Sequence, residues 1–183
     1  MSPRLERALR SSAVWHAGQT RKGSDVPYFE HAVAVAMILD RAGFDEDVVI
    51  AGLLHDVVED TEATFEDVAA RFGPSVCETV RACSEIKHDA QGRKRPWIDR
   101  KRDHLAALEE SPIPARAVAL ADKLHNLASI AHDLSLGRDV WSLFHADRSD
   151  VLGYYRAAAD RLSTGDPRLG RLAAECRAVL GGL

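Results

Sequence analysis

Residues 48–60 read Val-Val-Ile-Ala-Gly-Leu-Leu-His-Asp-Val-Val-Glu-Asp, an apolar segment that carries two pairs of ionisable side chains. At helical spacing His55 lies one turn before Glu59, and Asp56 lies one turn before Asp60. We therefore expect one buried helix with a polar, acidic edge. Burying an unpaired carboxylate costs roughly several kcal/mol unless a cation or hydrogen bonds compensate for the lost water. A bound divalent metal ion is the simplest source of that compensation.

Helical periodicity dominates the rest of the chain, and no alternating strand pattern stands out. Asp45 can cap the motif helix, Thr64 with Asp67 resembles a capping box, and Gly43 and Gly73 suit helix C-termini. These signals predict an all-α orthogonal bundle of seven to nine helices. The expected helices cover about 4–17, 31–42, 45–60, 64–73, 74–84, 97–110, 113–134, 147–163 and 167–180, with a polar loop at 18–27 and an irregular loop at 85–96.

The composition bounds the class of protein. A chain of 183 residues with 46% hydrophobic and 28% charged residues is expected to form one globular domain. A net charge of −4 argues against a strongly basic nucleic-acid binder. Three scattered cysteines are too few for a disulfide framework or a thiolate zinc site. No signal region or apolar run of membrane-spanning length is found, so we expect a cytoplasmic protein without a membrane partner.

Two further polar residues interrupt apolar helices and can complete a metal site. His31 begins the apolar segment 31–39, and Asp122 interrupts the apolar segment 117–124. With His55 and Asp56 they supply two imidazoles and two carboxylates, which suit a catalytic Mn, Fe, Co or Zn ion better than a closed structural site. Taken singly, His31 can be a hydrogen-bonded core histidine and Asp122 a salt-bridge partner. Three apolar helices that each carry such a residue favour the metal site.

These residues also resemble a known family. His31, His55-Asp56 and Asp122 resemble the H…HD…D pattern of the HD-domain metal phosphohydrolases. The extended segment 55–61 resembles their alarmone hydrolase branch, the RelA/SpoT-like guanosine-3′,5′-bispyrophosphate 3′-pyrophosphohydrolases and their small stand-alone relatives. Segments 18–22, 27–28, 72–73 and 121–126 are also similar, so the resemblance covers about residues 14–134. It implies a single HD domain over residues 1–183, in which C-terminal helices follow from residue 135, and one divalent ion, most simply Mn.

The resemblance assigns a catalytic role to the acidic pair. A divalent ion lowers the pKa of a bound water towards about 7, and the resulting hydroxide can attack phosphorus. Glu59 and Asp60 are then expected to orient that water or to transfer its proton. The alternative is that both residues only end the helix in solvent. Acidic residues at a helix C-terminus oppose the helix dipole, which disfavours this alternative.

A basic segment predicts the substrate side of the site. Residues 87–102 contain seven Lys and Arg residues against two aspartates, a local balance of +5 that could steer a polyphosphate by electrostatic attraction. The alternative is an ordinary solvated loop and helix face. In the alarmone hydrolases, positions resembling Arg21 and Lys22 lie by the nucleotide, and one resembling Asn126 contacts the sugar. The predicted substrate-binding residues are Arg21, Lys22, Lys87, Arg100, Lys101, Lys123 and Asn126.

Departures from the family pattern keep rival functions open. Ala32 stands where Pro is common, Ser84-Glu85 replaces a Thr-Lys-like element, and Ala128-Ser129 replaces a more basic segment. We predict a small-molecule nucleotide substrate with a 3′-pyrophosphate, such as guanosine tetraphosphate. The rivals are a 5′-nucleotidase-like enzyme, a two-metal phosphodiesterase with His88 and His104 as extra ligands, and a non-catalytic nucleotide sensor on the same fold.

Overall fold

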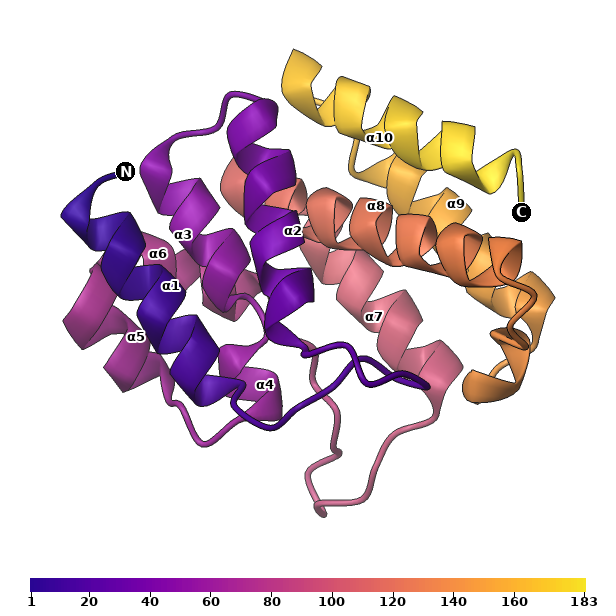
Figure 1. The fold of residues 1–183 in the computed structure, drawn as a ribbon, viewed down its shortest axis with the longest axis horizontal. Coiled ribbons are helices and arrows are strands. Elements are labelled where there is room, and N and C mark those ends of the chain that lie inside the picture. The colour runs from indigo at the N-terminus through magenta and orange to yellow at the C-terminus, as the bar shows by residue number, and fades with distance from the viewer.

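The computed structural model describes residues 1–183 and consists of helices joined by loops, with two isolated bridges in place of any strand. Figure 1 shows α8 running through the middle of the molecule, with α1 to α6 towards one end and α9 and α10 towards the other. The all-α prediction is confirmed. The helices are α1 (Pro3–Trp15), α2 (Phe29–Arg41), α3 (Glu46–Leu54), α4 (Val57–Asp60), α5 (Phe65–Phe72), α6 (Pro74–Cys83), α7 (Trp97–Glu109), α8 (Ile113–Ser135), the 3-10 turn η1 (Trp141–Leu143), α9 (Arg148–Arg161) and α10 (Pro167–Leu180).

The local signals in the sequence set most helix ends. The Asp45 side chain accepts a hydrogen bond of 3.1 Å from the Val48 backbone N–H at the start of α3. Thr64 and Asp67 form the reciprocal capping box that begins α5. Gly73 adopts a positive φ of 94° where α5 meets α6, a conformation that favours glycine. These caps satisfy backbone groups that a helix leaves without partners at its ends.

The motif segment is not one helix, which corrects the prediction. The segment is divided into α3 and α4 by a turn at His55 and Asp56, where Asp56 has φ −104° and ψ −3°. In a continuous helix, consecutive side chains diverge by about 100° around the axis. The turn instead brings His55 Nε2 to 2.9 Å from Asp56 Oδ2. The division also raises the number of α-helices to ten, one more than the upper end of the expected range.

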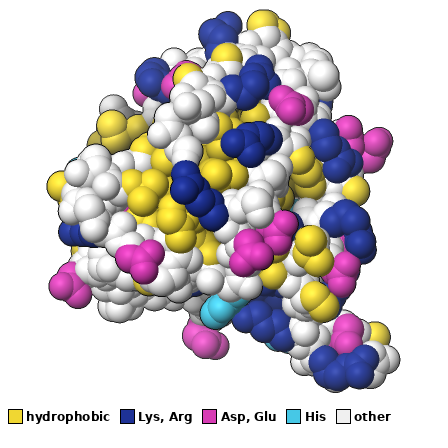
Figure 2. Space-filling view, turned by 90° about the vertical axis from the view of Figure 1, so that its right-hand side faces the viewer, with side chains coloured by type: hydrophobic (Ala, Val, Ile, Leu, Met, Phe, Trp, Pro, Cys, Tyr) yellow, Lys and Arg dark blue, Asp and Glu magenta, His cyan; other side chains and the backbone are white.

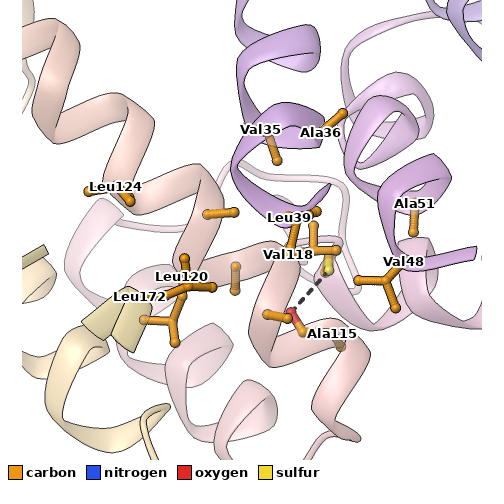
Figure 3. Close-up of a cluster of buried hydrophobic side chains, with 14 of the residues drawn as sticks. Val35, Ala36, Leu39, Val48, Ala51, Ala115, Val118, Leu120, Leu124 and Leu172 are labelled. Atoms are coloured by element: carbon orange, nitrogen blue, oxygen red, sulfur yellow. Dashed lines mark hydrogen bonds between the residues drawn. The ribbon is translucent and has the colours of Figure 1, made fainter. Parts of the chain in front are cut away.

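One continuous cluster of 42 buried apolar residues runs from Ala8 to Leu180 and holds the site's helices in place. Figure 3 shows part of it, where Val35, Leu39 and Leu120 project into the same interior. Its dashed line joins the Cys83 thiol to the Ala115 carbonyl oxygen, 3.5 Å apart. No helix has both the length and the apolar composition that spanning a membrane requires.

Gly52 allows α3 to lie close to α2 within this core. A Cβ atom at this position would lie 2.5 Å from Leu39 Cδ1 and 3.4 Å from Val35 Cγ1. The first distance is well below the separation of about 3.5–4.0 Å at which two carbon atoms are in van der Waals contact. The missing side chain therefore allows close spacing between α2, which carries His31, and α3, which His55 follows.

Candidate metal centre

Three segments far apart in the sequence bring their polar side chains together at one point. His31 comes from α2, His55 follows α3 and Asp122 comes from α8, and one ligand atom of each lies within 4.8 Å of the others. His31 Nε2 is 3.3 Å from Asp122 Oδ1, and His55 Nε2 is 3.9 Å from the same oxygen. Both histidines are buried. The chain thus has the convergence that the sequence pattern predicts.

Asp56 faces the same point from the turn between α3 and α4. Its Oδ2 lies 2.9 Å from His55 Nε2 and 3.8 Å from His31 Nε2. The Tyr28 hydroxyl donates a hydrogen bond to that oxygen. Burial, together with the charge of Asp56, raises the pKa of Tyr28, so the hydroxyl keeps its proton and remains a donor. Tyr28 is not among the predicted site residues.

The His55 ring is held in one orientation by its own helix. Its Nδ1 lies 2.8 Å from the Gly52 carbonyl oxygen, which can only accept, so Nδ1 carries the proton. Burial on its own lowers the pKa of His55, but the charge of Asp56 outweighs it and raises the pKa to about 9. The buried Nε2 makes no hydrogen bond of good geometry, despite its short distance to Asp56. An unsatisfied nitrogen beside two carboxylates is the environment that a cation would complete.

The donor set fits a divalent transition metal. Burial opposes ionisation of Asp56, but His55 outweighs it and holds the pKa of Asp56 below its ordinary value. Asp122 likewise has a lowered pKa, because Lys123 and His31 outweigh its burial. Two ionised carboxylates therefore lie beside two imidazoles, a mixture of oxygen and nitrogen donors that suits Mn, Fe, Co or Zn. His88, exposed in the loop after α6, and His104 on α7 are not part of this cluster.

The far side of His31 contacts a second histidine. His31 Nδ1 lies 2.7 Å from His125 Nδ1, and His125 Nε2 lies 3.2 Å from Glu30 Oε1. We call these three residues the histidine relay. Sequence reasoning did not identify it because 94 residues separate His31 from His125. The local signal is that His125 lies three residues, about one turn of α8, after the predicted ligand Asp122.

Glu59 and Asp60 lie in α4 beside this centre, and both bind Lys87. Lys87 Nζ is 3.0 Å from Glu59 Oε2 and 2.8 Å from Asp60 Oδ1. Glu59 Oε1 also accepts a 2.7 Å hydrogen bond from the Glu85 backbone N–H. The Glu59 side chain is only 14% exposed, and its burial raises the pKa of its carboxyl. Glu59 therefore does not simply end a helix in solvent.

Like Lys87, three other predicted substrate-binding residues form ion pairs with carboxylates. Arg100 and Lys101 on α7 both pair with Glu85, whose side chain is 5% exposed. Lys123 is buried, and its Nζ lies 2.7 Å from Asp122 Oδ2. The charge balance of residues 87–102 could be read from the sequence, but these ion pairs could not. A phosphate that binds these cations has to compete with the carboxylates that they already contact.

The remaining predicted residues lie around a cavity next to the centre. Arg21 donates a 2.8 Å hydrogen bond to Asn126 Oδ1, and Asn126 Nδ2 donates one of 2.5 Å to Asp122 Oδ1. Lys22 is exposed, with its Nζ 5.8 Å from the centre of the Phe144 ring. All three predicted residues line a cavity of about 460 Å³, together with Tyr28. Figure 2 shows the right-hand side of Figure 1, where Lys and Arg side chains, with Asp and Glu among them, lie over and beside a central group of hydrophobic side chains.

An all-helical bundle in which two histidines and an aspartate from three segments converge defines an HD domain. The family model described as "HD domain" matches residues 8–152, and the chain belongs to this family. Among known proteins it is similar to the guanosine-3′,5′-bis(diphosphate) 3′-pyrophosphohydrolase MESH1 of Drosophila melanogaster, with 40% identity over 132 residues that cover 70% of each chain.

Other relatives differ in how much of their length is matched. The bifunctional (p)ppGpp synthase/hydrolase SpoT of Escherichia coli is 37% identical over 128 residues, which cover 69% of this chain but 18% of that protein. A solved structure described as a metazoan ortholog of SpoT that hydrolyses ppGpp matches with a TM-score of 0.80 and 32% identity, over 100% of this chain and 98% of the other. The structure of lmo0812 from Listeria monocytogenes matches with a TM-score of 0.69 and 34% identity, over 86% and 99%.

Proposed function

We propose that this protein is a metal-dependent phosphohydrolase that hydrolyses the 3′-pyrophosphate of a guanosine tetraphosphate-like alarmone and releases pyrophosphate. The observation that carries the proposal is the convergence of His31, His55 and Asp122 within 4.8 Å in a chain that is 40% identical to a protein named for this activity. Cleavage of guanosine 3′,5′-bis(diphosphate) by water between the ribose 3′-oxygen and the pyrophosphate would yield GDP.

In this proposal, His31, His55, Asp56 and Asp122 hold one divalent cation, with Mn as the first candidate. Such a cation polarises water and neutralises phosphate charge. Glu59 accepts a proton from the attacking water. Its raised pKa makes its carboxylate a stronger base than an ordinary glutamate. Asp60, which follows Glu59 in α4, orients that water. Lys87 pairs with both carboxylates and holds them in position.

The cavity lined by Arg21, Lys22 and Asn126 is the proposed nucleotide side of the site. Lys87, Arg100, Lys101 and Lys123 stay predictions as phosphate ligands. Arg100, Lys101 and Lys123 would each exchange a carboxylate partner for substrate, whereas Lys87 would contact phosphate while it still pairs with Glu59 and Asp60. Cytoplasmic localisation and manganese as the native metal also stay predictions.

The proposal is tested with the purified protein, added Mn²⁺ and a panel of nucleotides. The panel contains guanosine 3′,5′-bis(diphosphate), GTP, GDP and several 5′-monophosphates, with pyrophosphate and phosphate measured separately. We expect pyrophosphate and GDP from the first substrate. Asp122→Asn is expected to reduce turnover at least about 100-fold, because it removes charge from a ligand.

Asp160→Asn is the matched control, because the exposed Asp160 on α9 pairs with Arg177, away from both the cluster and the nucleotide cavity. Its turnover should equal that of the wild type. Phosphate released from a 5′-monophosphate, with no pyrophosphate from any substrate, would replace the proposal with a 5′-nucleotidase. Nucleotide binding without turnover of any substrate would indicate a sensor.

A further inference from the structure

The histidine relay of Glu30, His125 and His31 has a proton arrangement that its geometry determines. Two Nδ1 atoms 2.7 Å apart can share only one proton, so one ring donates and the other accepts. At the other end, His125 Nε2 lies 3.2 Å from Glu30 Oε1, a carboxylate oxygen that can only accept. His125 Nε2 therefore carries a proton.

The neutral form of His125 then leaves its Nδ1 as an acceptor. His31 Nδ1 must be the donor, so His31 Nε2 has a free lone pair. That nitrogen is the atom that lies 3.3 Å from Asp122 Oδ1 and 3.8 Å from Asp56 Oδ2. A metal-binding histidine needs this state, with one nitrogen protonated and held and the other free.

We propose that His125 and Glu30 are positioning residues that fix His31 as the Nδ1–H tautomer and direct its Nε2 towards the cation. The inference rests on the metal site of the proposed function. His55 is fixed in the same way, but by the backbone carbonyl of Gly52. The chain thus holds one ligand through its backbone and the other through two side chains from α2 and α8.

The relay reaches the surface of the protein. His31 is almost completely buried, whereas His125 is partly buried and the Glu30 side chain is half exposed. His125 and Glu30 line a cavity of about 410 Å³ that also contains Arg21, Ser129 and His132. Glu30 and His125 can therefore be replaced with less disturbance of the core than His31 itself.

Mn²⁺ titration of the full chain by isothermal calorimetry tests the proposal. We expect His125→Phe to weaken Mn²⁺ binding about 10- to 100-fold, the usual range for loss of such an outer partner. His125→Asn places an amide oxygen where Nδ1 stood, so we expect it to recover most of the affinity. Glu30→Gln should weaken binding less than His125→Phe, because its side-chain oxygen can still accept. His132→Phe is the control, because His132 lines the same cavity without contacting His31.

A second measurement reads the tautomer without any metal. Nitrogen-15 NMR of the histidine rings in the metal-free protein should show His31 protonated at Nδ1 in the wild type and a mixture of tautomers in His125→Phe. Unchanged Mn²⁺ affinity and an unchanged His31 tautomer in His125→Phe would overturn the proposal. If that variant does not fold, His125→Ala, which also removes the acceptor for His31 Nδ1, is read in the same way. A wild type that binds no Mn²⁺ contradicts the proposed function, and the tautomer measurement alone then decides the relay.

Discussion

Tyr28 contributes two separable interactions to the metal centre. Its hydroxyl donates to Asp56, whereas its ring packs against His16 at 4.8 Å and His31 at 5.4 Å between ring centres. The ring belongs to the packing of the site, and the hydroxyl fixes the direction of one carboxylate. A substitution that removes only the hydroxyl can distinguish these contributions.

Tyr28→Phe should therefore lower the affinity for Mn²⁺ about 10-fold while the melting temperature of the metal-free protein stays close to that of the wild type. Calorimetric titration measures the first quantity and circular dichroism the second. Tyr154→Phe is the control, because the Tyr154 hydroxyl is buried without a hydrogen-bond partner. Equal Mn²⁺ affinities of Tyr28→Phe and the wild type would show that Asp56 does not need this donor.

The pH dependence of activity should report the pair of Glu59 and Lys87. Burial raises the pKa of Glu59, and Lys87 opposes that rise. If ionised Glu59 accepts the proton from water, activity is lost as the pH falls through this raised pKa. Removing Lys87 raises the Glu59 pKa further, so Lys87→Met should move the acid limb of the profile of kcat against pH towards higher pH.

Lys94→Met serves as the reference for this shift, because Lys94 lies in the same loop and makes no ion pair with its side chain. Its acid limb should coincide with that of the wild type. Glu59→Gln should remove the limb together with most of the turnover. An acid limb that moves to lower pH in Lys87→Met would rule out Glu59 as the base.

At the scale of helices, the predicted ends held where a side chain or a glycine sets them. The caps at Asp45 and Thr64 need only residues within one turn, so the sequence contains the whole interaction. The division between α3 and α4 is different, because residues 55–58 have no Gly or Pro that signals it. The turn is favoured by contacts between His55, Asp56 and residues distant in sequence, which a local pattern does not contain.

Gly52→Ala should destabilise the protein although alanine favours helices. The added methyl group would lie 2.5 Å from Leu39 Cδ1, so the buried Leu39 side chain would have to move within the core or α2 and α3 would have to separate. We expect the free energy of unfolding to fall by about 1–3 kcal/mol, the usual cost of overpacking. Urea denaturation measures this change.

Gly153→Ala in α9 is the matched comparison. Gly153 is exposed, and a Cβ atom there would meet nothing within 4 Å. This substitution should raise the free energy of unfolding by about 1 kcal/mol through helix propensity alone. Stabilisation by both substitutions would mean that the close spacing of α2 and α3 does not depend on Gly52.

At the scale of the whole molecule, the converging residues were easier to predict from the sequence than the residues that hydrogen-bond to them. His31, His55 and Asp122 could be singled out because each is polar within an apolar segment. Their hydrogen-bond partners could not, because Tyr28 and His125 meet Asp56 and His31 across 28 and 94 residues. The basic segment was counted correctly as charge, but its pairing with Glu85 depends on how α6 and α7 approach each other.

A metal that joins α2, α3 and α8 should stabilise the entire fold, because it binds the folded chain only. At a free Mn²⁺ concentration 100 times the dissociation constant, the free energy of unfolding should rise by about 2.7 kcal/mol. Thermal melts with Mn²⁺ and with EDTA measure the difference, and Asp122→Asn should abolish it. A melting temperature that does not depend on Mn²⁺ would show that the ion does not bind this centre in the folded chain.

Cys83 is one of three buried thiols in the core, and together they can report local opening of the fold. Cys77, Cys83 and Cys176 are all buried and free, on α6 and α10. Burial also raises the pKa of Cys83 and Cys176, which keeps them as unreactive thiols. Alkylating reagents therefore reach each sulfur only in molecules that have opened locally. Mass spectrometry of the labelled peptides can then rank the two helices by how often each detaches, without any engineered probe.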